Sequence, residues 1–182
     1  MNHYLPATTV GNTTDAASMR AFLQQAVDHY PRLVAFSLTL KLPYREVMSE
    51  YRSLILRFRT EVWQRTGEYS RQCQQARLSS PPTILRWMWE SASAPECEML
   101  LLMNLDTLGA LRDEVVQQEM SGILREAWST VTGTDSNVTR MASFIISRTG
   151  RCSFSQPFGQ LQAQVNEMVS PVMVARTGVV CP

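Results

Sequence analysis

The sequence is poor in the residues that most enzyme active sites use. It holds two histidines, His3 and His29, and a single lysine, Lys41, in 182 residues. Its four cysteines include no Cys-x-x-Cys pair, which excludes a zinc site of the usual spacing. It also lacks a Ser-His-Asp pattern, a glycine-rich phosphate loop and a dinucleotide fingerprint. These absences make catalysis of the common kinds an unfavoured interpretation.

Strong net charge and long apolar runs are missing too. The formal net charge is +1, so no global field draws the chain to nucleic acid or to acidic lipid. No apolar run is long enough to span a bilayer, and the start lacks the basic and apolar regions of a signal peptide. We therefore expect a cytoplasmic protein with reduced thiols and no membrane contact.

What is present is enough apolar material for one core and an unusual preference for arginine. Hydrophobic residues make up 45% of the chain, which argues against disorder and supports one domain. We expect a flexible arm over 1–12, a single domain over 13–170 and a tail over 171–182. Of the 17 basic residues only Lys41 is lysine. Arginine suits phosphate and interface contacts, but a compositional bias of the genome would give the same excess.

Hydrophobic periodicity divides the chain into alternating helices and strands. Three-and-four spacing predicts helices over 13–30, 44–65, 107–131 and 157–169. Alternation or continuous apolar runs predict strands over 32–42, 83–90, 96–106 and 138–146, with a short strand over 152–154. The polar stretch 67–82 is expected to be a long loop, and Gly133 is expected just past a helix end.

The order of the middle elements predicts an α+β fold. Strand, helix, strand, strand, helix, strand is the ferredoxin-like split βαβ arrangement, β-α-β-β-α-β. We expect an antiparallel sheet with both long helices on one face, plus an N-terminal and a C-terminal helix. The other face would stay open as a platform. Many unrelated functions use this fold, so it does not name one.

Two glutamates are the candidate catalytic and metal-binding residues. Glu96 and Glu98 stand one apart at the entry of the strand that holds the apolar run 99–103, so alternation puts them on one face. Carboxylates bind Mg²⁺ or Mn²⁺, with Ser37 or Thr39 as a conceivable third ligand. The same pattern is typical of a solvated pair at a strand start. No other cofactor is expected, and no histidine is placed to activate Cys97 between the two acids.

Arginines and tryptophans are the candidate contacts to a nucleic acid or protein partner. One set is spaced seven residues apart, so its members lie along a single outer line of the helix 44–65: Arg45, Arg52 and Arg59. This line is either a ridge that contacts phosphate groups or a solvated helix face. A second set near the last turn has the same two interpretations: Arg140, Arg148 and Arg151. Trp87 and Trp89 share one face of their strand, where they either stack bases or fill the core. If they fill the core, Arg86 lies on the other side of the strand and points onto the open platform.

Three segments resemble the replication protein family of filamentous phages and related prophages. They are the strand 33–43 with the helix after it, the pair 86–90 and 99–104, and the run 123–128, which ends in Trp128. That family is related to His-hydrophobe-His rolling-circle endonucleases. In such enzymes two histidines hold a divalent metal and a tyrosine attacks the scissile phosphate. The resemblance therefore implies a replication function on DNA.

The residues that would carry this chemistry are replaced here. Counted back from Asn104, the two histidine positions of the resemblance fall on Glu96 and Glu98. The family also carries a tyrosine, followed closely by a lysine, late in its sequence. In this chain the tyrosine position falls near Met173, and Arg176 stands at the lysine position. The resemblance thus implies a relative of phage replication initiators that has lost nicking activity.

Three functions follow as hypotheses. The first is a catalytically degenerate, mobile-element replication protein that binds DNA or the replication apparatus. The second is a mobile-element protein that inhibits a host complex, such as a defence complex, by protein–protein binding. The third is a metal-dependent nuclease that uses Glu96 and Glu98. The oligomeric state does not follow from the sequence.

Overall fold

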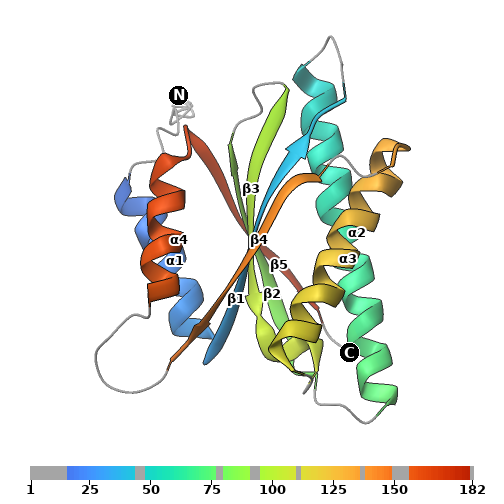
Figure 1. The fold of residues 1–182 in the computed structure, drawn as a ribbon, viewed down its shortest axis with the longest axis vertical. Coiled ribbons are helices and arrows are strands. Elements are labelled where there is room, and N and C mark those ends of the chain that lie inside the picture. Colours follow the sequence, from blue (N-terminus) through green and yellow to red (C-terminus); the bar gives the residue numbers. More distant parts are fainter. Residues whose placement is uncertain are drawn as a thin grey trace, which may run out of the picture.

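The computed structural model describes residues 16–43, 48–76, 80–90, 95–109, 112–135, 138–148 and 156–180. In this part of the chain a five-stranded antiparallel sheet is sandwiched between two pairs of α-helices (Figure 1). The α+β class predicted from the sequence is confirmed. The expected arm 1–12, Arg45, Arg151 and the expected strand 152–154 lie outside the described residues.

The sheet has the strand order β4-β1-β3-β2-β5. Its strands are β1 (Arg32–Lys41), β2 (Thr83–Glu90), β3 (Glu96–Asn104), β4 (Val138–Ser147) and β5 (Pro171–Val180). All four neighbouring pairs are antiparallel, so β1 and β2 run in the same direction with β3 between them. The central position of β3 agrees with its apolar character on both faces.

Four α-helices of the described ranges cover the sheet. They are α1 (Ala16–His29), α2 (Met48–Gln75), α3 (Asp113–Thr132) and α4 (Gln156–Glu167). A short 3₁₀ helix, η1 (Leu105–Leu108), follows β3. The positions of α1, β1, the β2–β3 pair, β4 and α4 agree with the sequence prediction to within a few residues. Gly133 ends α3 in the left-handed conformation with φ of 71°, as expected for a helix C-cap.

The larger core lies between the sheet and the pair α2 and α3. One set of alternating strand residues, including Phe36, Leu101 and Trp87, faces these two helices and is fully buried. Phe58 of α2 packs edge-to-face against Trp87 at 5.8 Å and against Trp128 of α3 at 5.4 Å. The aromatic cluster therefore joins both helices to the sheet.

The opposite face of the sheet is covered as well, so the expected open platform is wrong. Helices α1 and α4 lie side by side over it in Figure 1, on the far side of the sheet from α2 and α3. Leu23 of α1 and Leu161 of α4 are buried in one cluster with Leu33, Ala35 and residues of the neighbouring strands. The two long helices, α2 and α3, do share one face as predicted (Figure 1), but the small and polar residues of β1 on the other side were wrongly interpreted as a solvent-facing surface.

Helix α2 is longer than the sequence predicted. It continues ten residues past Arg65, through Gly67 and into the segment expected to be a loop. Gly67 costs a helix about 1 kcal/mol relative to alanine, so tertiary contacts must hold the last turns. Ser70 bonds Ser80, whose hydroxyl donates to the carbonyl of Thr107 at 2.6 Å. These buried bonds join the end of α2 to the segment before β2.

Two further boundaries differ from the prediction. The helix expected over 107–131 is divided, because η1 ends at Gly109, whose φ is 93°, and α3 begins only at Asp113. The segment expected to be a tail, 171–182, contains β5, which pairs with β2 along the edge of the sheet. Both features depend on tertiary pairing rather than on local sequence pattern.

Candidate functional site

The two candidate metal ligands lie at the end of the sheet where β3 begins. Glu96 pairs with Lys41 of β1 and is exposed, and Glu98 pairs with Thr39 and is half-buried. Both therefore lie on the α1/α4 side of the sheet, at the end where apolar residues give way to polar ones. Thr39, expected as a third ligand, is buried beside Glu98 in the register, but its hydroxyl is a weak metal ligand.

A third acid also lies near this end, which the sequence prediction missed. Glu90 ends β2, and the pairing of Trp89 with Met99 brings it beside Glu98. One carboxylate oxygen of Glu90 accepts a bond from the backbone N–H of Val169 at 2.9 Å. Within the described residues, no group of three acidic, histidine or cysteine side chains is arranged to hold a metal ion. The geometry thus gives the glutamate pair no complete ligand set.

Cys97, between the two glutamates, is buried in the opposite core. Burial raises the pKa of its thiol to about 12, and the negative charges of Glu90 and Glu98 add to the shift. A thiol with so high a pKa is protonated at neutral pH and is a poor nucleophile. This environment agrees with the sequence argument against a catalytic role for Cys97.

The expected arginine ridge on α2 is not a continuous exposed line. Arg52 is exposed, whereas Arg59 is only 8% exposed and lies over the ring of Trp89, with 4.9 Å between its guanidinium carbon and the ring centre. Arg59 is thus engaged in a cation–π contact inside the α2/α3 layer. The prediction of a shared outer line is wrong for Arg59, because α2 lies close to the sheet at this turn.

The remaining arginines do not gather into one surface. Arg86 is 8% exposed on the α1/α4 side of β2, so it does not lie on an open platform as predicted. Arg140 and Arg148 are exposed but lie near opposite ends of β4. Arg148 lies eight positions after Arg140, which in extended chain is roughly 26 Å. They do not form the cluster that the sequence suggested.

Of the two interpretations of the tryptophans, the structure supports the core. Trp87 is fully buried against Phe58, and Trp89 is partly covered by Arg59. Neither ring lies on an open sheet face. Base stacking on these side chains would require α2 to move away from the sheet.

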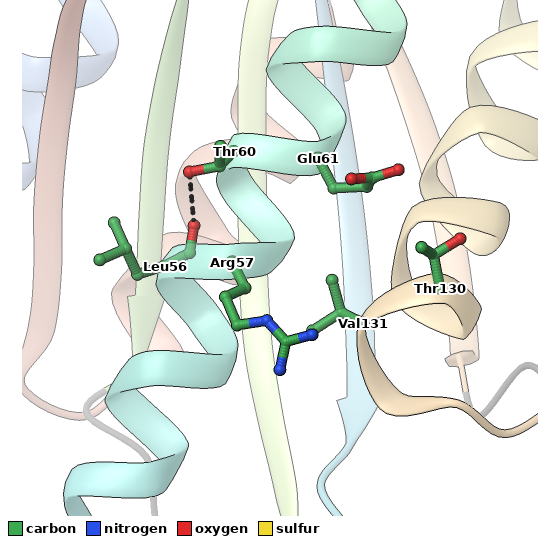
Figure 2. A pocket seen from close by; sticks show the side chains of 6 residues that line it. All are labelled: Leu56, Arg57, Thr60, Glu61, Thr130 and Val131. Atoms are coloured by element: carbon green, nitrogen blue, oxygen red, sulfur yellow. Dashed lines mark hydrogen bonds between the residues drawn. The ribbon is translucent and has the colours of Figure 1, made fainter.

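A surface groove of about 330 Å³ lies between α2 and α3 (Figure 2). Its lining mixes apolar and charged groups: Leu56, Arg57, Thr60, Glu61, Thr130 and Val131. Leu56 is 56% exposed, unusually high for a leucine in a helix that packs against a sheet. Sequence periodicity gave no sign of this groove, because its two walls are distant in the chain.

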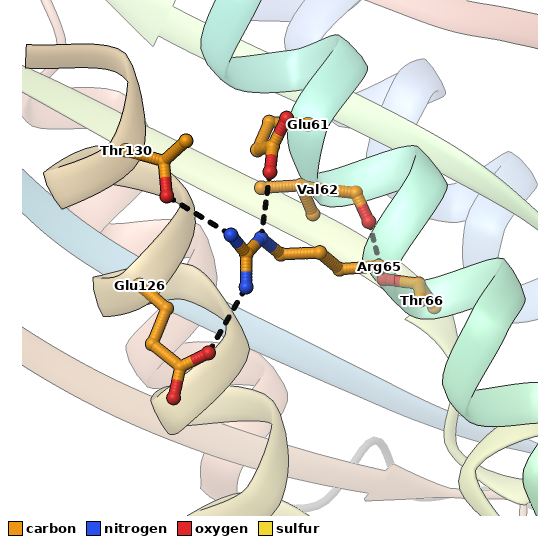
Figure 3. A network of polar contacts seen from close by, with 6 residues as sticks. All are labelled: Glu61, Val62, Arg65, Thr66, Glu126 and Thr130. Carbon is orange, nitrogen blue, oxygen red and sulfur yellow. Dashed lines mark hydrogen bonds and ion pairs between the residues drawn. The ribbon is translucent and has the colours of Figure 1, made fainter.

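Beside the groove, a polar network ties the two helices together (Figure 3). Arg65 of α2 donates to Glu61 at 2.8 Å, and across to Glu126 and Thr130 of α3 at 3.0 and 2.9 Å. Two residues that line the groove, Glu61 and Thr130, are therefore bonded to the same arginine. This arrangement gives a shaped surface with both signs of charge.

A second ion-pair cluster was not predicted. Arg32, at the start of β1, donates to Asp106 of η1 at 2.7 Å and to Asp113 at the start of α3. The two carboxylates raise the pKa of the Arg32 guanidinium against the opposing effect of its partial burial. The cluster joins β1, η1 and the start of α3.

Comparison with protein-family models gives a match. Residues 8–143 match the family described as uncharacterised conserved protein UCP030791, and the chain belongs to this family. No curated protein and no solved structure matches. Separately, no helix in the described ranges is both long enough and apolar enough to cross a membrane.

Proposed function

We propose that this protein, a member of a family whose description assigns no activity, acts by binding another protein and not by catalysis. The observation that carries this proposal is the covering of both sheet faces by helices. It removes the surface on which ferredoxin-like proteins could stack bases. Contacts with a partner must then use helix surfaces, loops or strand edges.

The α2/α3 groove is the surface we propose for this contact. It combines the exposed Leu56 with Arg57 and Glu61, and protein interfaces commonly combine apolar residues with polar ones. Exposed arginines and acids alternate over the described surface, as at Arg125 and Glu126 of α3. Mixed charge of this kind favours a protein partner over a phosphate backbone.

The proposal extends to origin and context. The order β4-β1-β3-β2 supports a ferredoxin-like split βαβ core to which β5 is added. On this core we propose a degenerate relative of filamentous-phage replication initiators, carried by a mobile element, that binds the replication apparatus or inhibits a host complex. We also propose a cytoplasmic location, which the buried free thiols Cys73 and Cys97 support.

DNA binding is the second candidate, favoured by the exposure of Arg140 on β4 and of Arg148 just after it. It predicts an affinity that falls steeply with salt and weakens when these two charges are removed. A metal-dependent nuclease using Glu96 and Glu98 gains no support from the geometry of the described residues. It predicts DNA cleavage with Mg²⁺ or Mn²⁺ that Glu98→Ala abolishes.

One set of measurements separates these functions. Fluorescence anisotropy with labelled single- and double-stranded DNA, at low and physiological salt and with Mg²⁺ or Mn²⁺, tests DNA binding. A denaturing gel of the same samples tests cleavage. We expect neither binding nor product. Tight, salt-sensitive binding lost in the variant Arg140→Ala/Arg148→Ala would replace our proposal with the DNA function.

The positive test uses the groove itself. Tagged protein, expressed in the cells from which the chain comes, should co-purify with a partner whose retention changes little with salt. The variant Leu56→Glu should lose this partner, whereas Val115→Glu should retain it, because Val115 is exposed on α3 but does not line the groove. Equal retention by both variants would exclude the groove as the contact surface.

A further inference from the structure

Strand β4 is a long edge of the sheet. It spans ten residues, Val138–Ser147, and pairs with β1 along one side over nearly its whole length. Among the residues that the structure describes, no strand pairs with its other side. An edge of this kind presents a row of backbone donors and acceptors that can pair with another chain.

The sequence of β4 carries little protection against such pairing. Natural edge strands are usually interrupted by proline, lysine, a central bulge or an inward-pointing charge. β4 has no proline, glycine, lysine or acid, and Arg140 is its one charged residue. Its register shift lies opposite Thr39 and Leu40 and so affects only its first residues. The other edge, β5, begins with Pro171 and contains Gly178, which weaken strand pairing.

The side chains of β4 are also incompletely covered. Met141, Phe144 and Ile145 are only partly buried, although a strand in the interior of the sheet, such as β3, buries nearly every residue. Ala142 is exposed, although its neighbour on β1, Ser37, is buried. The apolar character of β4 therefore exceeds what the described part of the chain buries.

We propose that β4 pairs antiparallel with β4 of a second copy of this chain, around a two-fold axis at Ala142, and joins two five-stranded sheets into one. Arg140, Ala142 and Phe144 all lie on the α1/α4 side of the strand. Pairing about Ala142 sets Arg140 of each copy opposite Phe144 of the other. Arg140, the one charged residue of β4, therefore lies opposite an aromatic ring and not opposite Arg140 of the other copy.

This register also suits the centre of the interface. The two Ala142 side chains meet at the axis, where small residues avoid a clash. Because residues opposite each other share a face, the α1/α4 side of one copy continues into the α1/α4 side of the other. The inference goes beyond the proposed function, since it concerns a different surface from the α2/α3 groove.

The first experiment measures the mass of the purified full chain by light scattering across a concentration series. We expect twice the single-chain mass of 20.6 kDa at high concentration, with dissociation on dilution. A mass that stays at 20.6 kDa up to the highest soluble concentration overturns the proposal. Neither result depends on whether the groove binds a partner, so the two proposals fail separately.

Charge variants at the axis then locate the interface. Ala142→Lys and Ala142→Glu each place like charges opposite one another and should weaken the dimer by about fivefold to tenfold. Mixing the two variants should restore association through unlike charges. Ala21→Lys is the matched control, because Ala21 is an exposed alanine on α1. A dimer unchanged by Ala142→Lys, or a mixture no tighter than its components, overturns the proposal.

A disulfide tests the register. Directly opposite residues in antiparallel strands lie about 4.5–5.5 Å apart between Cα atoms, within the range that a disulfide bridges. Ala142→Cys should therefore give an oxidised covalent dimer on a non-reducing gel, beyond any product of the natural cysteines in the unsubstituted chain. Ala21→Cys should not. Equal cross-linking of both variants would overturn the assigned register.

Discussion

The two faces of the sheet differ in how completely they are apolar. On the α2/α3 side, buried strand residues run the whole length of the central strands, from Cys97 to Met103 on β3. On the α1/α4 side the apolar cluster stops at Leu100, and Glu98 and Glu96 follow. Ser37 is buried at this transition and accepts a hydrogen bond from the Gln164 side chain of α4.

This difference shows how a covered face can look open in a sequence. A strand side that contains serine, threonine and lysine satisfies the pattern of a solvent-facing surface. Here the helices α1 and α4 cover that side with their own apolar stripes and satisfy Ser37 with an amide. The four predictions below test the two faces against each other.

The largest effect should come from the aromatic cluster of the α2/α3 face. Trp128→Ala removes a fully buried ring that packs edge-to-face on Phe58, so we expect a loss of about 3–5 kcal/mol in the free energy of unfolding. Urea titration followed by circular dichroism measures it. Val115→Ala, at an exposed site of the same helix, should change stability by less than about 0.5 kcal/mol.

The α1/α4 face should be almost as sensitive. Leu161 of α4 is fully buried, and Leu161→Ala should cost about 2–5 kcal/mol because it leaves a cavity under the helix. Val169→Ala, 71% exposed just after α4, is the control and should have little effect. If Leu161→Ala lowered the free energy of unfolding no more than its control, α4 would not be packed on the sheet. That face of the sheet would then be open, as the sequence predicted.

A pH effect should appear at the end where the two faces differ. An exposed thiol loses its proton near pH 9, whereas the pKa of Cys97 in the folded chain is raised to about 12. Between these values the folded state binds the proton more tightly, so stability is full below pH 9 and falls as the pH rises toward 12. Urea titrations at pH 8 and 10 should show this fall. Cys97→Ala should reduce it.

The smallest effect should come from the outer polar network. Arg65 is 31% exposed and Glu126 is 71% exposed, so water screens their attraction. Arg65→Met should reduce the free energy of unfolding by only about 0.2–1 kcal/mol. High salt should lower the stability of the unsubstituted chain and leave the variant less affected. A loss as large as that of Trp128→Ala would mean that the network, and not the core, holds α2 to α3.

The candidate site was less predictable than the fold. Spacing correctly put Glu96 and Glu98 on one side of β3, and only the structure decided that Trp87 fills the core. Spacing could not show that Glu90 lies beside Glu98, because that contact depends on the register of β2 and β3. It also could not show that Arg59 is buried, since seven-residue spacing gives a helix line but not its distance from the sheet.

The sequence by itself determined the elements whose signals are local. Alternation defined β1, three-and-four spacing defined α1 and α4, and the apolar run of β3 gave its central position. Tertiary structure alone decided the elements that need distant partners. The last turns of α2 form because buried hydroxyls bond Ser80 and Thr107, and β5 forms because β2 offers a free edge. The closing of the second sheet face belongs to this group too, because a strand's pattern shows which residues share a side but not what covers them.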